Sequence, residues 1–244
     1  MTIQATFPGC RGCARFATGP APVCMSCARP RLQLAGSDSC PVCCQRLDGN
    51  GRCPNALCRS PRRRVGRIHA IAYQEGPLRR VINEYKYRGA SYWPVVLGRL
   101  LLAWLDQAMA ADPPGLIVAN PSFVGAGGQL FAHTEAVLRA AAEADAAGHR
   151  WPFDVREPAA VVKTGPTLRS ADEAAWYKRF TADDLRGALR IPDRARTEGK
   201  FVLVYDDICT TGGQLDTVAG CLLDDGGAQR VEGVVLARAP WRRL

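Results

Sequence analysis

Residues 202–213 read VLVYDDICTTGG, and they give the clearest indication of the fold. Four apolar or aromatic residues, Val202 to Tyr205, precede two adjacent aspartates, and a turn rich in threonine and glycine follows. A solvated loop does not need the apolar run, and a buried core does not readily accept adjacent acids. The stretch therefore predicts a buried strand that ends at Tyr205, with Asp206 and Asp207 emerging at its carboxyl end onto a site.

Strand and helix patterns alternate on both sides of this stretch. Strands are expected at 67–73, 116–119, within 151–162, at 201–206 and at 231–237, and helices at 76–89, 94–105, 130–146 and 214–224. The polar stretch 163–179 follows no clear pattern. Such alternation is typical of an α/β fold whose parallel sheet is covered by helices on both faces. Ligands of these sheets bind outside the carboxyl ends of the strands.

The turn after the aspartates has the composition of a phosphate-binding turn. Backbone amides at a helix N-terminus, together with threonine hydroxyls, hold anions, and Gly212 and Gly213 let the backbone approach closely. Asp206 and Asp207 would repel a phosphate, so they suit sugar hydroxyls or a metal ion carried by the substrate. A simple strand-end turn is the structural alternative. Together these features describe a site for a phosphorylated ribose.

Length and composition fit one domain of ordinary size with a small appendage, since the chain has 244 residues. No run of about 18 apolar residues is present, so a membrane span is not expected. The first ten residues, MTIQATFPGC, lack the pattern of a signal peptide. A cytoplasmic protein is therefore expected.

Nine of the eleven cysteines lie between Cys10 and Cys58, in a segment with few apolar residues. A chain of that size without a core usually needs a metal ion to fold, and closely spaced cysteine pairs favour structural zinc over a disulfide or reactive cluster. We expect two zinc ions, each held by two pairs. The eight expected ligands are Cys10, Cys13, Cys24, Cys27, Cys40, Cys43, Cys53 and Cys58.

Two questions about the ligands stay open at this point. Sequential pairing places the first four cysteines on one ion and the last four on the other, but interleaved pairing is also possible. Cys44 is left over and could replace Cys43, although the two-residue spacing favours Cys43. The expected boundaries are a zinc module at 1–64 and a larger domain at 65–244.

The formal charge of +9 comes entirely from the first 67 residues, which hold eleven arginines and only two acids. Arg62, Arg63 and Arg64 follow the last cysteine, with Arg67 close behind. These arginines are either a solvated linker or a patch that contacts phosphates of single- or double-stranded DNA.

The run VLVYDDICTTGG resembles the phosphoribosyl diphosphate (PRPP) motif of type I phosphoribosyltransferases. With the cysteine pairs and the segment YQEGPLRRVINEYKYRG at 73–89, nearly the full chain resembles the ComF/GntX family. The resemblance implies a type I phosphoribosyltransferase sheet, PRPP binding with Mg²⁺, transfer of phosphoribose to an unknown acceptor, and a role in DNA uptake by competent bacteria.

The resemblance also implies roles for particular residues. Asp206 and Asp207 would bind the ribose hydroxyls, and Asp207 would also orient the ribose or act as a base. The 5′-phosphate would be held by Thr210, Thr211, Gly212, Gly213 and Gln214. Lys86 and Arg88 match the family's KY-x-G segment, although they are equally well explained as cations at a helix C-terminus. Asn120 to Ser122 would form the pyrophosphate turn.

This chain departs from the family pattern at the pyrophosphate side. The family's RGFNQ element is replaced by a segment without the arginine, in which His133 lies near the expected position. Loss of that cation would weaken transfer more than PRPP recognition. His133 itself is expected on a helix surface. Lys163, with Arg169, Lys178 and Arg179, forms either a basic flap over the substrate or, more simply, a solvated face.

Two functions from different classes follow. The first is a magnesium-dependent phosphoribosyltransferase. The second is a non-catalytic, DNA-contacting zinc protein that binds PRPP or a nucleotide. Cys209 and Cys221 have no evident base partner in the sequence, so we expect a small filler and a core residue, respectively.

Overall fold

The computed structural model describes residues 32–36, 38–88, 93–126, 128–129, 131–145, 150–167 and 177–241. Their strands are β1 (Ile68–Tyr73), β2 (Leu116–Ala119), β3 (Val162–Lys163), β4 (Leu189–Arg190), β5 (Phe201–Cys209) and β6 (Arg230–Arg238). Their helices are α3 (Ala56–Arg59), α4 (Gly76–Arg88), α5 (Trp93–Ala108), α6 (His133–Asp145), α7 (Tyr177–Ala188), α8 (Gly213–Asp224) and the short 3₁₀ helix η3 (Arg194–Arg196).

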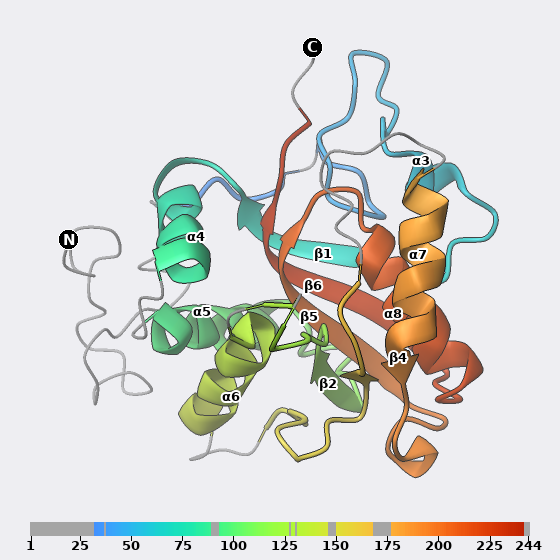
Figure 1. Ribbon diagram of the computed structural model, residues 1–244. Coiled ribbons are helices and arrows are strands. Elements are labelled where there is room, and N and C mark those ends of the chain that lie inside the picture. Colours follow the sequence, from blue (N-terminus) through green and yellow to red (C-terminus); the bar gives the residue numbers. More distant parts are fainter. Residues whose placement is uncertain are drawn as a thin grey trace.

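A four-stranded parallel sheet in the order β1-β6-β5-β2 forms the centre of the described fold. Its strands read as nearly continuous apolar runs because helices cover both faces, and the LIVA of β2 is buried throughout. Helices α4, α5 and α6 lie on one side and α7 and α8 on the other (Figure 1). The predicted α/β fold with a parallel sheet is confirmed.

The observed helices and strands differ from the predicted ones mainly in the middle of the chain. Between 151 and 162 the expected strand is reduced to one bridge, Ile117 to Phe153, because this segment touches the edge strand β2 at only one point. The polar stretch that follows contributes β3, which pairs antiparallel with β4. Helix α7 lies between β3 and β4 and was not predicted.

Residues 32–64, the described part of the cysteine module, pack directly on the sheet. The amide of Ile68 donates to the carbonyl of Val42 at 2.7 Å, and the amide of Tyr73 donates to that of Gln33 at 2.7 Å. Cys40 and Cys43 belong to the same apolar cluster as the residues on the α8 side of the sheet. This part of the module therefore shares its core with the larger domain.

Gly98 allows α5 and α6 to approach closely. A Cβ atom at this position would lie 2.7 Å from the backbone nitrogen of Ala141. We expect Gly98→Ala to lower stability by about 1–3 kcal/mol, because backbone must move to admit the methyl group. Thermal unfolding should show a melting temperature lower by roughly 3–10 °C. Gly187→Ala in α7 is the control, since nothing lies within 4 Å there; equal effects of both changes would contradict the prediction.

Candidate functional site

The two aspartates lie inside β5, which continues to Cys209, so the expected end of the strand at residues 205–206 is wrong. Strand β6 runs beside β5 as far as the pair Cys209 and Arg238, and this gives the extended backbone its hydrogen-bond partners. On the other side β2 stops at Ala119, opposite Tyr205. Asp206 and Asp207 are buried, with 7% and 5% of their surface exposed. They lie at the point where β5 pairs with β6 but no longer with β2.

Each carboxylate has specific partners in this position. The side-chain amide of Asn120 donates to Asp206 Oδ2 at 2.9 Å, and the backbone amide of Asp207 donates to Asp206 Oδ1 at 2.8 Å. The ammonium of Lys86, from α4, lies 2.8 Å from Asp207 Oδ2. Burial, and then the adjacent charge of Asp207, raise the pKa of Asp206 to about 8. The buried Asp207 and the half-buried Lys86 thus form an ion pair beside a carboxyl group whose raised pKa favours its protonated form at neutral pH.

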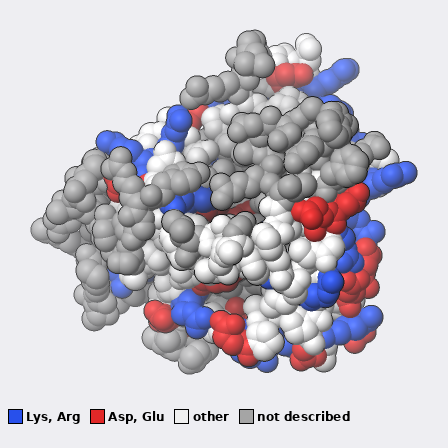
Figure 2. All heavy atoms as spheres, in the orientation of Figure 1, with Lys and Arg blue, Asp and Glu red and all other residues white. Residues whose placement is uncertain are grey.

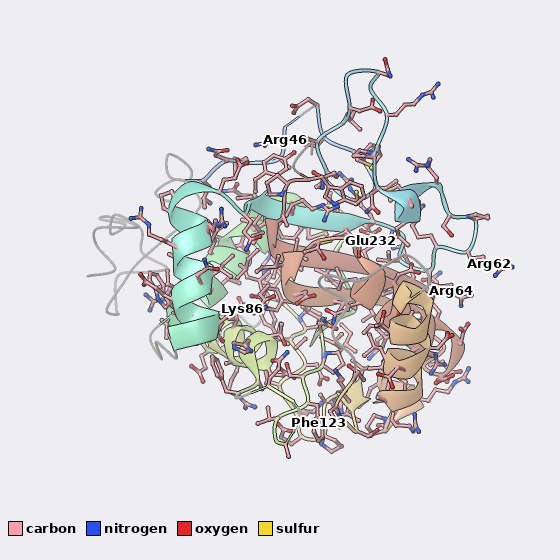
Figure 3. The ribbon with its side chains drawn as sticks, turned by 45° about the horizontal axis from the view of Figure 1, so that its top comes forward. Arg46, Arg62, Arg64, Lys86, Phe123 and Glu232 are labelled. Atoms are coloured by element: carbon pink, nitrogen blue, oxygen red, sulfur yellow. The ribbon has the colours of Figure 1, made fainter. Side chains whose placement is uncertain are left out.

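A pocket opens above these carboxylates and encloses about 550 Å³ of space, part of it open to solvent. Six of the residues expected in the site line it, from α4, β5, α8 and the segment after β2. These are Lys86, Asn120, Ser122, Asp206, Asp207 and Gln214. Figure 3 shows Lys86 toward the C-terminal end of α4, facing the site. The side chain of Arg88 lies outside the described residues.

The remaining expected residues form the 210–214 turn, which leads from β5 into α8. Gly212 has a φ of +86°, and a Cβ there would lie 2.7 Å from Ile68 Cδ1, so this position requires glycine. The N-cap residue Gly212 has no side chain to cap α8, and the amide of Gly213 makes only a long hydrogen bond, 3.4 Å, to Thr211 Oγ1. Thr210, Thr211, Gly212 and Gly213 do not line the pocket itself; they border it next to Gln214. The turn therefore presents a helix N-terminus beside the carboxylates.

The segment expected to form a pyrophosphate turn is already hydrogen-bonded to a carboxylate of the protein. Glu135 accepts from the backbone amide of Ser122 at 2.7 Å and from its hydroxyl at 2.9 Å. Thr134 adds a third hydrogen bond to the same carboxylate, at 2.8 Å. A pyrophosphate could reach the Ser122 amide only if Glu135 moved away.

Two pocket residues were misjudged from the sequence. His133 is buried and not on a helix surface, because the start of α6 packs against the end of α4 and its ring lies edge-on to Tyr85. Burial lowers the pKa of His133. Lys163 is half-buried in the pocket wall and donates to Thr167 Oγ1 at 2.6 Å, and burial lowers its pKa as well. The solvated face favoured for Lys163 is thus wrong, since α7 packs beside β3 and carries Leu185 to the same wall.

The raised pKa of Asp206 has a consequence for stability. Between the ordinary pKa of an aspartate, near 4, and the folded value of about 8, the folded protein holds a proton that the unfolded chain releases. Stability is therefore lost as the pH rises through this window. We expect Asp206→Asn to melt at least 4 °C above the wild type at pH 9, roughly 1–2 kcal/mol, with a clearly smaller gap at pH 6. A gap that does not change with pH would contradict this assignment.

Four cysteines converge at one point of the described module. The Sγ atoms of Cys40, Cys43, Cys53 and Cys58 all lie within 4.8 Å of one another. The Sγ distances from Cys40 to Cys58 and from Cys43 to Cys53 are 3.8 and 3.7 Å. Zinc bonded to four thiolates at about 2.3 Å requires edges of about 3.8 Å, whereas a disulfide requires about 2.05 Å. The four could therefore bind one zinc ion, and they are the second set of the sequential pairing.

Cys44 has a different role from its neighbour. Its backbone lies in the left-handed region, with φ of 53°, and its amide donates to the carbonyl of Cys40 at 2.9 Å. It closes the turn that aims Cys40 and Cys43 at the same point, and its own thiol is not among the four. Cys10, Cys13, Cys24 and Cys27 lie outside the described residues.

The other cysteines are buried as expected. Cys209 is the last residue of β5, next to the guanidinium of Arg238, and Cys221 packs in the core under α8. Burial raises the pKa of the Cys209 thiol to about 12, so it is not a nucleophile at neutral pH.

The arginines of the linker are largely used within the molecule. Arg63 donates to the carbonyls of Val65 and Cys58, and Arg64 pairs with Asp224. Arg62 points away from the body (Figure 3). On the face drawn in Figure 2, positive and negative side chains of the described residues are interspersed. DNA binding through this segment stays a prediction from the sequence.

Comparison with known proteins does not identify the chain. No family model matches it. No curated protein shows significant similarity to it. Among the described helices, none is both long and apolar enough to cross a lipid bilayer.

Proposed function

We propose that the pocket binds PRPP, or a related phosphorylated ribose, together with Mg²⁺. The observation that carries this proposal is the meeting of two chemically different groups at the carboxyl end of β5. Asp206, Asp207 and Asn120 offer acceptors and a donor suited to a diol, and the 210–214 turn offers backbone amides at the start of α8. A phosphorylated ribose carries a diol and a phosphate at a separation that one small pocket can bridge.

The charges in the pocket support a substrate that brings its own cation. Asp207 is neutralised by Lys86, and the raised pKa of Asp206 favours its protonated form at neutral pH, so the empty pocket avoids two adjacent negative charges. Bound Mg²⁺ would favour the ionised form of Asp206 and would stabilise charge on a leaving pyrophosphate. Asp206, Asp207 and Asn120 supply the oxygen atoms that this ion prefers.

The pocket supports binding of the ribose phosphate more strongly than transfer. Glu135 occupies the Ser122 amide where a pyrophosphate oxygen would be needed. Lys163 is a cation that lines the same pocket and would partly replace the arginine missing from the family element. If transfer occurs, Lys163 and a displaced Glu135 would have to accommodate the leaving pyrophosphate.

Calorimetric titration of the full chain with PRPP and Mg²⁺ tests the proposal. A saturable heat at micromolar PRPP, reduced when Mg²⁺ is omitted, is the expected result. Release of pyrophosphate with a panel of bases would then show whether the protein is an enzyme. Absence of heat from correctly folded wild-type protein would end the proposal.

A further inference from the structure

The cysteine module and the 210–214 turn are joined by direct hydrogen bonds. Asn55 is buried and lies two residues after Cys53 in the sequence, and its side-chain Nδ2 donates to the carbonyl of Thr211 at 2.8 Å. Its Oδ1 accepts from the amide of Leu57 at 3.1 Å and so caps α3, the helix that carries Cys58. One side chain thus fixes both the cysteine cluster and the turn.

Close packing also joins the cysteine module to the 210–214 turn. A Cβ on Gly212 would lie 3.0 Å from Leu57 Cδ2, so the module packs against the turn without space between them. The linker that follows the module is also tied to α8, because the amides of Arg64 and Val65 donate to Asp216 Oδ1 at 2.7 and 2.9 Å. The N-terminal turn of α8 is therefore held from the module side at several points.

A buried guanidinium forms the second connection. Arg238 is fully buried, and it donates to the carbonyl of Cys209 at 2.7 Å and to that of Thr210. Its Nη2 also lies 3.7 Å from the Sγ of Cys43. Among the described residues, no carboxylate forms an ion pair with Arg238, and its Nε has no hydrogen-bond partner. A buried cation needs a compensating charge, and a zinc ion with four thiolates carries a net charge of −2.

We propose that the Cys40, Cys43, Cys53 and Cys58 cluster, when it holds its metal ion, positions the 210–214 turn through Asn55 and Arg238. Metal occupancy would then control how well the turn is ordered. The consequence for phosphate affinity rests on the proposed function, but the coupling between cluster and turn does not. In this arrangement Asn55 is a positioning residue that contacts neither metal nor substrate.

Asn55→Asp is the most specific test, because aspartate still caps α3 but has no donor for Thr211. Amide hydrogen exchange in the zinc-loaded full chain gives the readout at Asp216, whose amide donates to the carbonyl of Gly212. We expect exchange at least tenfold faster in Asn55→Asp, with unchanged zinc content. The amide of Asn120, bonded to Tyr205, should stay as protected as in the wild type. Asn50→Asp adds the same charge at an exposed position of the module and should leave Asp216 unchanged.

Chelation of the metal from wild-type protein should produce the same local loss of protection at Asp216. Affinity for ribose 5-phosphate should fall about tenfold in Asn55→Asp and stay unchanged in Asn50→Asp. Unchanged exchange at Asp216 in both Asn55→Asp and chelated protein would overturn the coupling, even if ribose 5-phosphate binds. Faster exchange in a protein that binds neither ribose 5-phosphate nor PRPP with Mg²⁺ would leave the coupling standing and would reject the proposed function.

Discussion

Replacing both Asp206 and Asp207 by asparagine is expected to reduce affinity for PRPP with Mg²⁺ at least about 100-fold. Hydrogen bonds to charged groups contribute about 1.5–3 kcal/mol each, so losing two of them accounts for a change of this size. The variant also lacks the carboxylate oxygens that Mg²⁺ prefers as ligands. Calorimetric titration of both proteins under identical conditions measures the effect.

For Asp206, unfolding does not explain a loss of affinity, because the substitution removes a buried carboxyl group that is unfavourable above neutral pH. Asp206→Asn should therefore bind more weakly and yet melt at a higher temperature than the wild type. Replacement of Asp207 breaks the ion pair with Lys86, so thermal unfolding of the double variant must show that it is folded at the titration temperature. Asp183→Asn, at an exposed position of α7, is the matched control and should bind as the wild type does. If the double variant gave the same heat as the wild type, these carboxylates would not belong to the binding site.

Cys43→Ser is expected to lose one equivalent of zinc and to lower the melting temperature by about 10 °C or more. Structural zinc sites contribute several kcal/mol to folding, and three remaining thiolates cannot complete a tetrahedral site. Cys43 is fully buried in the core that the module shares with the sheet, so the damage would spread to α8. Metal analysis and thermal unfolding measure the two effects.

Cys44→Ser provides a sharp control, because the neighbouring thiol is also buried but is not one of the four converging sulfur atoms. It should keep the zinc content of the wild type and lose little stability. Loss of zinc from Cys44→Ser with retention in Cys43→Ser would reverse the assignment of the fourth ligand.

Helix α5 and strands β2 and β5 could be predicted because the residue patterns that indicate them are local. Helix α5 has an apolar face at helical spacing, and β2 and residues 201–205 of β5 are continuous apolar or aromatic runs, so type and approximate position follow from the sequence pattern. Helix α7 and the two-residue strands β3 and β4 carry too few apolar residues for a period to emerge. Their formation depends on packing against α8 and the pocket wall.

Burial of the pocket residues could not be predicted in the same way. Asp206 and Asp207 are buried because β6 extends past β2, and His133 is buried because α4 and α6 meet at their ends. Neither fact is visible in the residues themselves. The sequence did indicate that carboxylates, an amide and a glycine-rich turn belong to one edge of a parallel sheet, since that edge collects the carboxyl ends of all its strands.

Local residue patterns were enough to predict the alternation of strands and helices, the spacing that brings cysteines together in pairs, and the chemistry of the stretch 202–213. These depend on residues within one turn or one strand of each other, where backbone geometry fixes which side chains meet. By contrast, three contacts depend on how the whole chain packs: Asn55 donates to Thr211, Arg238 lies between Cys43 and Thr210, and Glu135 accepts from the amide of Ser122. Buried donors and charges require hydrogen-bond or charge partners, and these groups become buried only when distant segments pack together.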